Sequence, residues 1–237
     1  MLIDMHAHTS GISRCCQADA AEVLATARRA GIDGLVLCNH YQESYINDEG
    51  PEAFAEAYIA EYERVKQMAD EMQFALFFGV EVTAKLHDNV HILLYGLPPA
   101  FLREHPDIYA WPLEKMARFT WERGGLIVQA HPFRRVRRMM DLAWLDGIEI
   151  NCHPLYDATH CAELMDIASE KGKLVTCGGD YHADTYRAVC GTYFPDGLRT
   201  SQELVQYLKT TQEIRLHVHE LRQEEHGDVV FRKNASI

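Results

Sequence analysis

Short apolar runs alternate along the chain with longer segments in which apolar residues recur at helical spacing. The runs lack polar alternation, which is typical of strands buried on both faces of a parallel sheet. We therefore predict strands at Leu2–Met5, Gly34–Cys38, Phe74–Val82, His91–Tyr95, Leu126–Ala130, Gly147–Ile150 and Leu174–Cys177.

Helices are predicted between these runs, from helical periodicity and from residues that start or stop helices. Asp19 and Ser201 are suitable N-caps, Gly31 ends the first helix, and Pro51 opens a long one. The predicted helices are Asp19–Ala30, Pro51–Met72, Pro112–Arg123, Tyr156–Lys171 and Ser201–Thr210.

Strands that alternate with helices favour a mainly parallel α/β sheet. In 237 residues, of which 47% are hydrophobic, a TIM-like barrel of about seven or eight strands closes such a sheet economically. No linker or internal repeat interrupts the chain, so we predict a single domain over residues 1–237. Residues 211–237 are predicted to extend it with strands at Glu213–Leu221 and Val229–Arg232, joined around His226-Gly227-Asp228.

The charge balance limits the partners. The chain has 23 Lys and Arg against 35 Asp and Glu, a formal net charge of −12, which argues against nucleic acid or an anionic membrane as the main partner. A small anionic substrate stays compatible, because bound metal cations reverse the local field. The oligomeric state cannot be inferred from this pattern.

Neither a signal peptide nor a membrane span is evident. The opening MLIDMHAHTS lacks a basic region followed by an apolar run, and no apolar stretch approaches the roughly 20 residues of a membrane span. The seven cysteines form no CxxC pair, so we expect a cytoplasmic protein with free thiols. Most of these thiols are interpreted as small core residues: Cys38, Cys152, Cys161, Cys177 and Cys190.

Histidine and acidic residues follow most of the predicted strands. In a parallel barrel the carboxyl ends of all strands open onto one face, so residues far apart in the sequence meet there. Imidazole and carboxylate groups are suitable ligands for zinc, manganese or iron. The candidate ligands are His6, His8, His40, Glu81, His91, His131, His153, Asp180 and His182.

The spacing of two pairs strengthens this prediction. Residues two apart in a strand point the same way, so His6 and His8 can hold one ion between them, as can Asp180 and His182. His91 is the exception, because it begins its predicted strand rather than ending it.

Five motifs, within residues 2–195, resemble the PHP (polymerase and histidinol phosphatase) family. They are DMHAHTSGIS at the N-terminus, CNH at 38–40, GVEV at 79–82, AHPFR at 130–134 and GGDYHAD at 178–184. Asn39 stands where the family usually has Asp. The chain is most similar to small stand-alone bacterial members rather than to the polymerase-attached module.

The resemblance implies a distorted (β/α)7 barrel and two or three divalent metal ions. It assigns His6, His8, Glu81 and Asp180 to one ion, and Glu81, His91 and His131 to a second. A third takes His40, His182 and a ligand from the first loop.

The first loop departs from the family pattern. Arg14 stands about where the family often has His or Asp, and a guanidinium cannot bind a metal cation. A thiolate is a good zinc ligand, so we hypothesise that the neighbouring Cys15 completes the third site. His153 is a further candidate ligand, with a substrate contact or an ordinary loop position as alternatives.

The resemblance implies phosphoester hydrolysis, and we expect a phosphatase that acts on a small phosphomonoester, such as histidinol phosphate or a nucleotide. Asp180 or His182 would orient the nucleophile or protonate the leaving group, and Arg134 would bind the phosphate. Arg14, Arg187 and Tyr41 are secondary candidates for substrate contact, with aromatic packing as the alternative for Tyr41. The alternative functions are a phosphodiesterase or exonuclease on nucleic acid, and a metal-stabilised binding domain without turnover.

Overall fold

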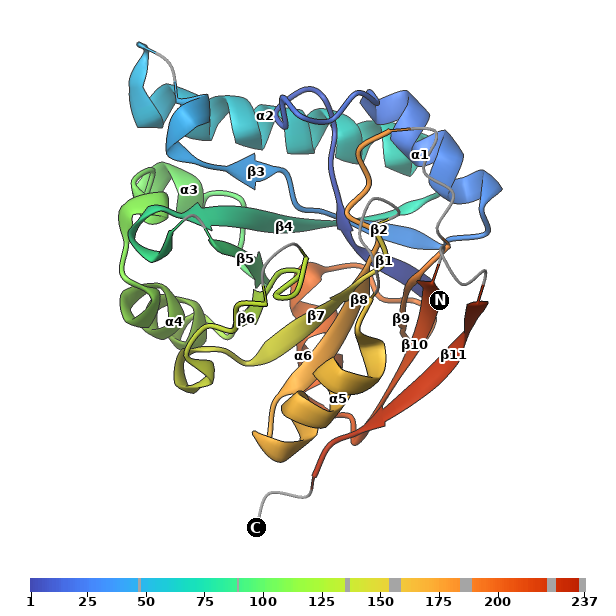
Figure 1. The fold of residues 1–237 in the computed structure, drawn as a ribbon. Coiled ribbons are helices and arrows are strands. Elements are labelled where there is room, and N and C mark those ends of the chain that lie inside the picture. The colour runs from blue at the N-terminus through green and yellow to red at the C-terminus, as the bar shows by residue number, and fades with distance from the viewer. Residues whose placement is uncertain are drawn as a thin grey trace.

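Seven strands curve around a common axis and nearly close into a barrel (Figure 1). The computed structural model describes residues 1–46, 48–88, 90–134, 137–153, 159–183, 189–220 and 225–234. Around the barrel the strands are β1 (Leu2–Ala7), β2 (Gly34–Leu37), β4 (Ala75–Ala84), β5 (Val90–Tyr95), β6 (Leu126–Gln129), β7 (Gly147–Asn151) and β8 (Leu174–Gly178). A parallel bridge between Ala7 and Tyr181 brings the chain after β8 back against β1. The fold is thus a mixed α/β domain of the TIM-like barrel type, as predicted.

One strand of the barrel runs against the others. β5 is antiparallel to both β4 and β6, whereas the pairs β1–β2, β2–β4, β6–β7 and β7–β8 are parallel. The start of β5 therefore lies at the same rim as the ends of the other strands, and His91 pairs with Thr83 there. This reversal explains why a candidate ligand begins its strand. The short β3 (His40–Tyr41) adds a parallel pairing to β4 at this rim.

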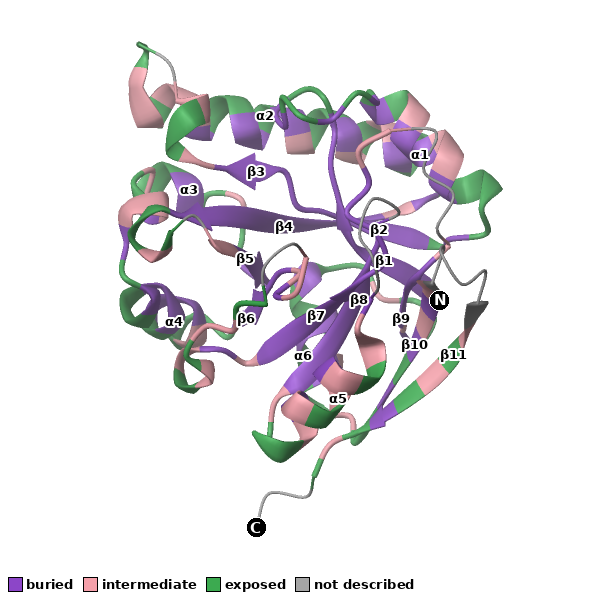
Figure 2. Ribbon diagram, in the orientation of Figure 1, coloured by how far each residue is buried: buried purple, intermediate pink, exposed green. Residues whose placement is uncertain are grey.

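Helices cover the outside of the barrel. α1 and α2 lie side by side across one side of it, and in Figure 2 the barrel strands are buried while the outer faces of the helices are exposed. The helices are α1 (Ala20–Arg29), α2 (Gly50–Glu71), α3 (Phe101–Glu104), α4 (Leu113–Glu122), α5 (Cys161–Glu170) and α6 (Ser201–Thr210), with 3₁₀ turns η1 (Glu43–Tyr45), η2 (Lys85–His87), η3 (Ile108–Ala110) and η4 (Leu142–Trp144). None of the helices in the described ranges is both long and apolar enough to cross a membrane.

The predicted N-cap residue caps α1 but not α6. The Asp19 side chain accepts a hydrogen bond from the Glu22 amide, 3.0 Å away, so the predicted N-cap of α1 is confirmed. The predicted cap of α6 was wrong, because Thr200 forms a capping box with Glu203 and Ser201 is already helical. Ser201 Oγ instead bonds the main chain of Phe78, 2.8 Å from its carbonyl oxygen, and so ties α6 to β4.

α5 begins later than its periodicity predicts. His160 has a left-handed backbone (φ 53°), and the right-handed helix starts only at Cys161. Residues 154–158, where the predicted helix begins, lie outside the described residues.

The C-terminal strands extend the barrel sheet. β10 (Glu213–Glu220) pairs with β9 (Gly191–Tyr193), which is antiparallel to β1. The predicted turn at His226-Gly227-Asp228 was wrong: these residues lie inside β11 (Glu225–Arg232), paired with His219, Val218 and His217 of β10. A glycine beside an aspartate resembles a turn in sequence, but the continuous pairing with β10 overrides that local preference.

Candidate metal centre

Four buried residues from three separate parts of the sequence meet at the barrel mouth. His6 and His8 come from β1 and the residue after it, Glu81 from β4, and Asp180 from the segment after β8. Their donor atoms all lie within 4.8 Å of one another. His8 Nε2 is 3.0 Å from both His6 Nε2 and Asp180 Oδ1. This group coincides with the set expected for the first ion.

Glu81 stands between two sets of imidazoles. Its Oε1 lies 2.7 Å from His91 Nδ1 and 3.1 Å from His131 Nε2. Its Oε2 lies 3.4 Å from His6 Nε2 and 2.5 Å from His40 Nδ1. One carboxylate therefore presents one oxygen to each side, which is the arrangement that a carboxylate bridging two cations requires.

The contact between His40 and Glu81 provides a test of whether a metal fits. His40 Nδ1 and Glu81 Oε2 are both buried and 2.5 Å apart, yet neither makes a hydrogen bond of acceptable geometry. Buried polar atoms are normally hydrogen-bonded, so two that converge without a bond need another partner. Imidazole nitrogens and carboxylate oxygens are ligands of divalent transition metals. The donor set therefore fits metal ions held at this mouth.

Further groups of donors surround the first one. The structure brings together His40, Glu81 and His91; His8, His40 and His182; and His153, Asp180 and His182. His40 thus approaches Glu81 and His91 as well as His182, so it contacts donors of both the second and the third expected sites. His153, whose position after β7 was ambiguous in the sequence, lies among candidate ligands.

Cys15 lies beside the third of these sites. Its Sγ is 3.2 Å from His182 Nε2 and accepts a hydrogen bond from the hydroxyl of Tyr45 at 3.5 Å. Burial would raise the pKa of this thiol, but hydrogen bonds from His182 and His40 lower it to about 5. Cys15 therefore has the position that a thiolate ligand requires, whereas its role as a ligand stays a prediction.

Charges at the mouth are arranged around the carboxylates. Burial alone would raise the pKa of Glu81, but His40, His91 and His6 hold it well below its ordinary value. Burial would also lower the pKa of His40, but the charge of Glu81 and the bond to Cys15 raise it to about 10. Burial and the neighbouring His182 and His40 lower the pKa of His8 well below its ordinary value, which leaves a neutral imidazole. Divalent cations bound among these groups would replace protons such as that on His40 in balancing the carboxylates.

Glu149 contacts two of the candidate ligands, and the sequence did not single it out. It is fully buried in β7, and its Oε1 lies 2.8 Å from His6 Nδ1. Its Oε2 accepts hydrogen bonds from the His131 amide at 2.9 Å and from the side chain of Asn151 at 3.1 Å. A carboxylate on the far nitrogen of a ligating imidazole fixes its tautomer and orientation. In the sequence, the only indication of this role is that Glu149 is an acidic residue inside the otherwise apolar run GIEI.

Asn39 organises the first loop. Its Oδ1 accepts hydrogen bonds from the Thr9 amide at 2.8 Å and from Ser13 Oγ at 2.9 Å. Ser13 Oγ in turn lies 3.0 Å from His8 Nδ1. Asn39 therefore supports the position of His8 through the loop, since its side-chain oxygen accepts from Thr9 and from Ser13, and Ser13 contacts His8.

Two candidate ligands have a left-handed backbone. His131 has φ 29° and Asp180 has φ 53°, a region that costs a non-glycine residue about 1–3 kcal/mol. Both turn the chain immediately after a barrel strand, so that their side chains approach Glu81 and His8 respectively. Such strain is typical of functional sites.

The proposed substrate residues lie in different surroundings. Arg134 lines a small cavity beside His131 and Glu149. Arg14 points its guanidinium at the carbonyls of Ser44 and Tyr45, at 3.3 and 2.7 Å, and so holds the η1 segment. Arg187 lies outside the described residues.

Tyr41 does not reach the mouth. It is fully buried, its hydroxyl donates to the Pro106 carbonyl at 3.0 Å, and its ring packs against Phe54 and Tyr58. The structure therefore contradicts substrate contact by Tyr41 and supports aromatic packing. In a strand as short as β3, the side chain after His40 points to the opposite face.

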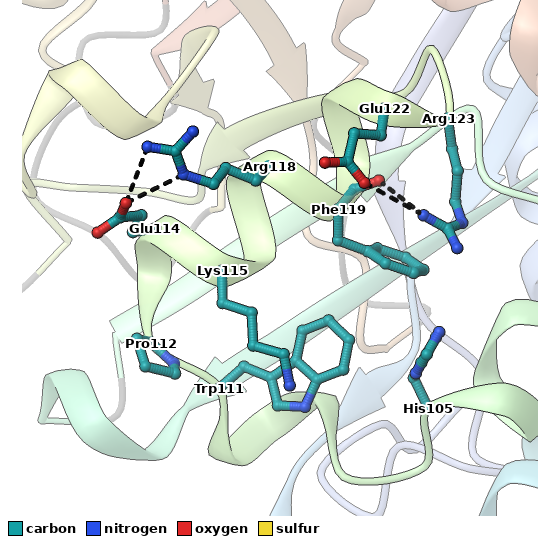
Figure 3. Close-up of a pocket in the computed structure, with 9 residues that line it drawn as sticks. All are labelled: His105, Trp111, Pro112, Glu114, Lys115, Arg118, Phe119, Glu122 and Arg123. Carbon is teal, nitrogen blue, oxygen red and sulfur yellow. Dashed lines mark hydrogen bonds and ion pairs between the residues drawn. The ribbon is translucent and has the colours of Figure 1, made fainter.

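One cavity lies away from this chemistry. A groove of about 510 Å³ runs along α4 on the outside of the barrel, lined by Trp111, Lys115, Phe119 and Arg123 among others (Figure 3). Lys115 Nζ stands 3.6 Å from the centre of the Trp111 ring. Because this groove contains no member of the metal-binding groups, we place the functional site at the mouth.

Comparison with known proteins supports the architecture. No protein-family model matches the chain, and no curated protein does. Among solved structures, PsfC from Pseudomonas syringae aligns with a TM-score of 0.59 and 18% identity over 86% of this chain and 87% of that one. An amidohydrolase from Chromobacterium violaceum, solved with bound sulfate and no metal, aligns with a TM-score of 0.53 and 16% identity over 87% of this chain and 96% of that one. This chain shares their fold. At these identities the likeness concerns the barrel alone.

Proposed function

We propose that this protein is a metal-dependent phosphoesterase of the PHP type, which hydrolyses a small phosphomonoester. The observation that carries the proposal is Glu81, whose two oxygens face separate sets of imidazoles. Zinc, manganese and iron all suit such donors. Divalent cations at such a site supply hydroxide near neutral pH and neutralise charge on phosphoryl oxygens.

The side chains would divide the work around the cations. His6, His8, Glu81 and Asp180 would hold one ion, and Glu81 with His91 and His131 would hold a second. The fully buried members exclude water from the donors and keep them in place. His182 is about one-sixth exposed (17%), and its Nδ1 donates to the Asp180 carbonyl at 2.7 Å. Its other nitrogen, Nε2, would pass a proton to the leaving alkoxide in the form of the site that holds two ions and no third.

Arg134 is the proposed phosphate-binding residue. It lies beside His131. Burial is the main cause of the low pKa, about 4, of His153, and the positive charges of His182 and Arg134 lower it further. A guanidinium matches two phosphate oxygens at once. The sulfate bound to the similar amidohydrolase, a tetrahedral anion like phosphate, is consistent with such a ligand.

Amide hydrolysis is a second candidate, favoured by the amidohydrolase among the similar structures. The same bridged pair of cations could activate water for attack on a carbonyl carbon.

The substrate class is tested by assay. Purified protein loaded with Mn²⁺ or Zn²⁺ is assayed on p-nitrophenyl phosphate, bis-p-nitrophenyl phosphate and a panel of amides. We expect chelator-sensitive turnover of the monoester.

Other outcomes would replace the proposal. Faster diester turnover indicates a phosphodiesterase or nuclease, and turnover of amides alone indicates an amidohydrolase. Failure on every substrate at full metal occupancy indicates a metal-stabilised binding domain.

The role of Arg134 is tested by Arg134→Ala. We expect KM for the phosphomonoester to rise about tenfold, the loss of one charge-assisted contact, with metal content unchanged. Arg137→Ala is the matched control, because Arg137 is exposed and pairs with Glu163 on α5. Unchanged kinetics in Arg134→Ala would remove this residue from the site.

A further inference from the structure

Three thiols meet on the outer face of the barrel. Cys152 follows β7, Cys177 lies in β8 and Cys190 precedes β9, and all three are buried. Their sulfur atoms lie within 4.8 Å of one another, and Cys152 Sγ is 3.7 Å from Cys177 Sγ. We call these residues the thiol trio.

The sheet separates the thiol trio from the metal centre. A Cβ placed on Gly178 would collide with His6 and with Glu149, so Gly178 faces the barrel interior. Because neighbouring residues of a strand point to opposite faces, Cys177 faces outward. It contacts β10 there, where its Sγ lies 3.4 Å from the carbonyl oxygen of His217.

Main-chain groups hold the thiol trio in place. The His219 amide donates to Cys152 Sγ at 3.4 Å, and the Cys177 amide donates to Thr192 Oγ1 at 3.0 Å. Gly191, next to Cys190, passes so close to the carbonyl of Ile3 that a side chain there would clash, so the chain is fixed against β1 beside the trio. Segments far apart in sequence therefore present three sulfurs to one point.

The spacing fits a shared cation. Sulfurs bound at about 2.3 Å to one ion stand about 3.8–4.0 Å apart in tetrahedral or trigonal geometry. The 3.7 Å separation of Cys152 and Cys177 is close to this value, and it is far longer than a disulfide of about 2.05 Å. Cys38 offers the contrast of an ordinary core thiol, whose Sγ donates to the Met5 carbonyl at 3.6 Å outside any donor group.

We propose that Cys152, Cys177 and Cys190 form a buried three-thiolate site for Cu⁺, separate from the metal centre at the barrel mouth and independent of the proposed function. Soft thiolate ligands select Cu⁺ and Zn²⁺. Structural zinc almost always has four ligands, whereas the donors that converge here in the described part of the chain are three sulfurs, so Cu⁺ is preferred. On binding, each thiol releases its proton to solvent and the ion joins the end of β7, β8 and the start of β9.

The test uses the full chain carrying Cys15→Ser, which removes the thiol at the mouth. Cu⁺ or Zn²⁺ is added without oxygen against a competing chelator, and we measure bound metal, ultraviolet thiolate-to-copper absorption and Tm. We expect one Cu⁺ per chain with this absorption and a higher Tm, and a bound-Zn²⁺ count that is the same with and without Cys190, because zinc at the barrel mouth does not involve the trio. Both copper effects persist in Cys38→Ala, the matched buried-thiol control, and are lost in Cys190→Ala.

Several results would overturn the site. These are unchanged copper absorption in Cys190→Ala, a bound-Zn²⁺ count that falls in Cys190→Ala, or a disulfide within the trio of the native protein. Should Cys190→Ala fail to fold, X-ray absorption of the copper-loaded Cys15→Ser protein decides: three sulfur neighbours support the site and nitrogen neighbours refute it. Phosphoesterase activity enters none of these readouts.

Discussion

The donors at the barrel mouth and the thiol trio on its outer face are both buried, but they differ in charge. At the mouth, Glu81 and Asp180 are ionised carboxylates whose pKa values are held well below their ordinary range. The trio consists of thiols, which a protein core accommodates as small apolar groups. A buried charge must be balanced, whereas a buried thiol need not be.

This difference shows what each region requires of a metal. Without positive charge, the carboxylates of the mouth would repel one another, and the barrel mouth would become less ordered. The trio keeps its packing with or without an ion. We therefore expect changes at the mouth to act on metal binding and activity together, and changes near the trio to act mainly on stability.

The largest effect is expected from Glu81→Gln, which removes the charge shared by both sides of the mouth. Loss of a supporting carboxylate alone costs about 10–100-fold, so loss of this bridging one should lower kcat/KM by at least about 100-fold. Metal analysis should show reduced occupancy. Glu56→Gln on α2, where the acid pairs with Arg103 at the surface, is the control. Full occupancy and activity in Glu81→Gln would refute the bridging role.

Glu149→Gln should have the next largest effect. The amide keeps the shape but loses the charge that orients His6, so we expect metal affinity to fall by about 10–100-fold. Competition with a chromogenic chelator measures this affinity, and Glu163→Gln on the exposed surface of α5 is the control. An unchanged affinity would reduce Glu149 to a packing residue.

Cys15→Ser tests the third site. We expect the metal count to fall by one ion while the Glu81-bridged pair remains, because Cys15 contacts His182 rather than Glu81. Plasma emission counts the metals, with Cys161→Ser as the control. A count equal to that of the unaltered protein would exclude Cys15 as a ligand.

The smallest effect is expected from Asp228→Asn, in the strands next to the trio. Asp228 of β11 bonds His217 of β10 at 2.8 Å, and the carbonyl of His217 contacts Cys177. This bond, with those from Arg215 and Tyr193, lowers the pKa of Asp228 below 3.8, so its stabilising contribution is present above pH 3.8 and is lost as pH falls through the folded-state pKa. Because the pair is largely solvated, Asp228→Asn should lower the unfolding free energy at pH 7 by less than about 1 kcal/mol.

Urea unfolding at pH 7 and at about pH 2.5, well below the ordinary Asp pKa, measures this difference. The gap between the parent and Asp228→Asn should shrink at the lower pH, with Asp166→Asn as a surface control. A gap that widens on acidification would contradict the assignment.

The sequence by itself determined most of the elements and the principal donors. Apolar runs predicted every barrel strand, because strands buried on both faces must be continuously apolar. His6, His8, Glu81 and Asp180 could be predicted as neighbours because strand ends converge in a barrel. Local signals failed where tertiary pairing competed with them, as at Ser201 and at His226–Asp228.

Only the tertiary structure decided the rest. The direction of β5 explained His91, since a strand's apolar pattern is the same in either direction. The left-handed turns at His131 and Asp180, the orientation of Glu149 and the meeting of the thiol trio depend on contacts between segments far apart in the chain. Periodicity along one segment shows which face is buried, and only the assembled barrel shows what that face meets.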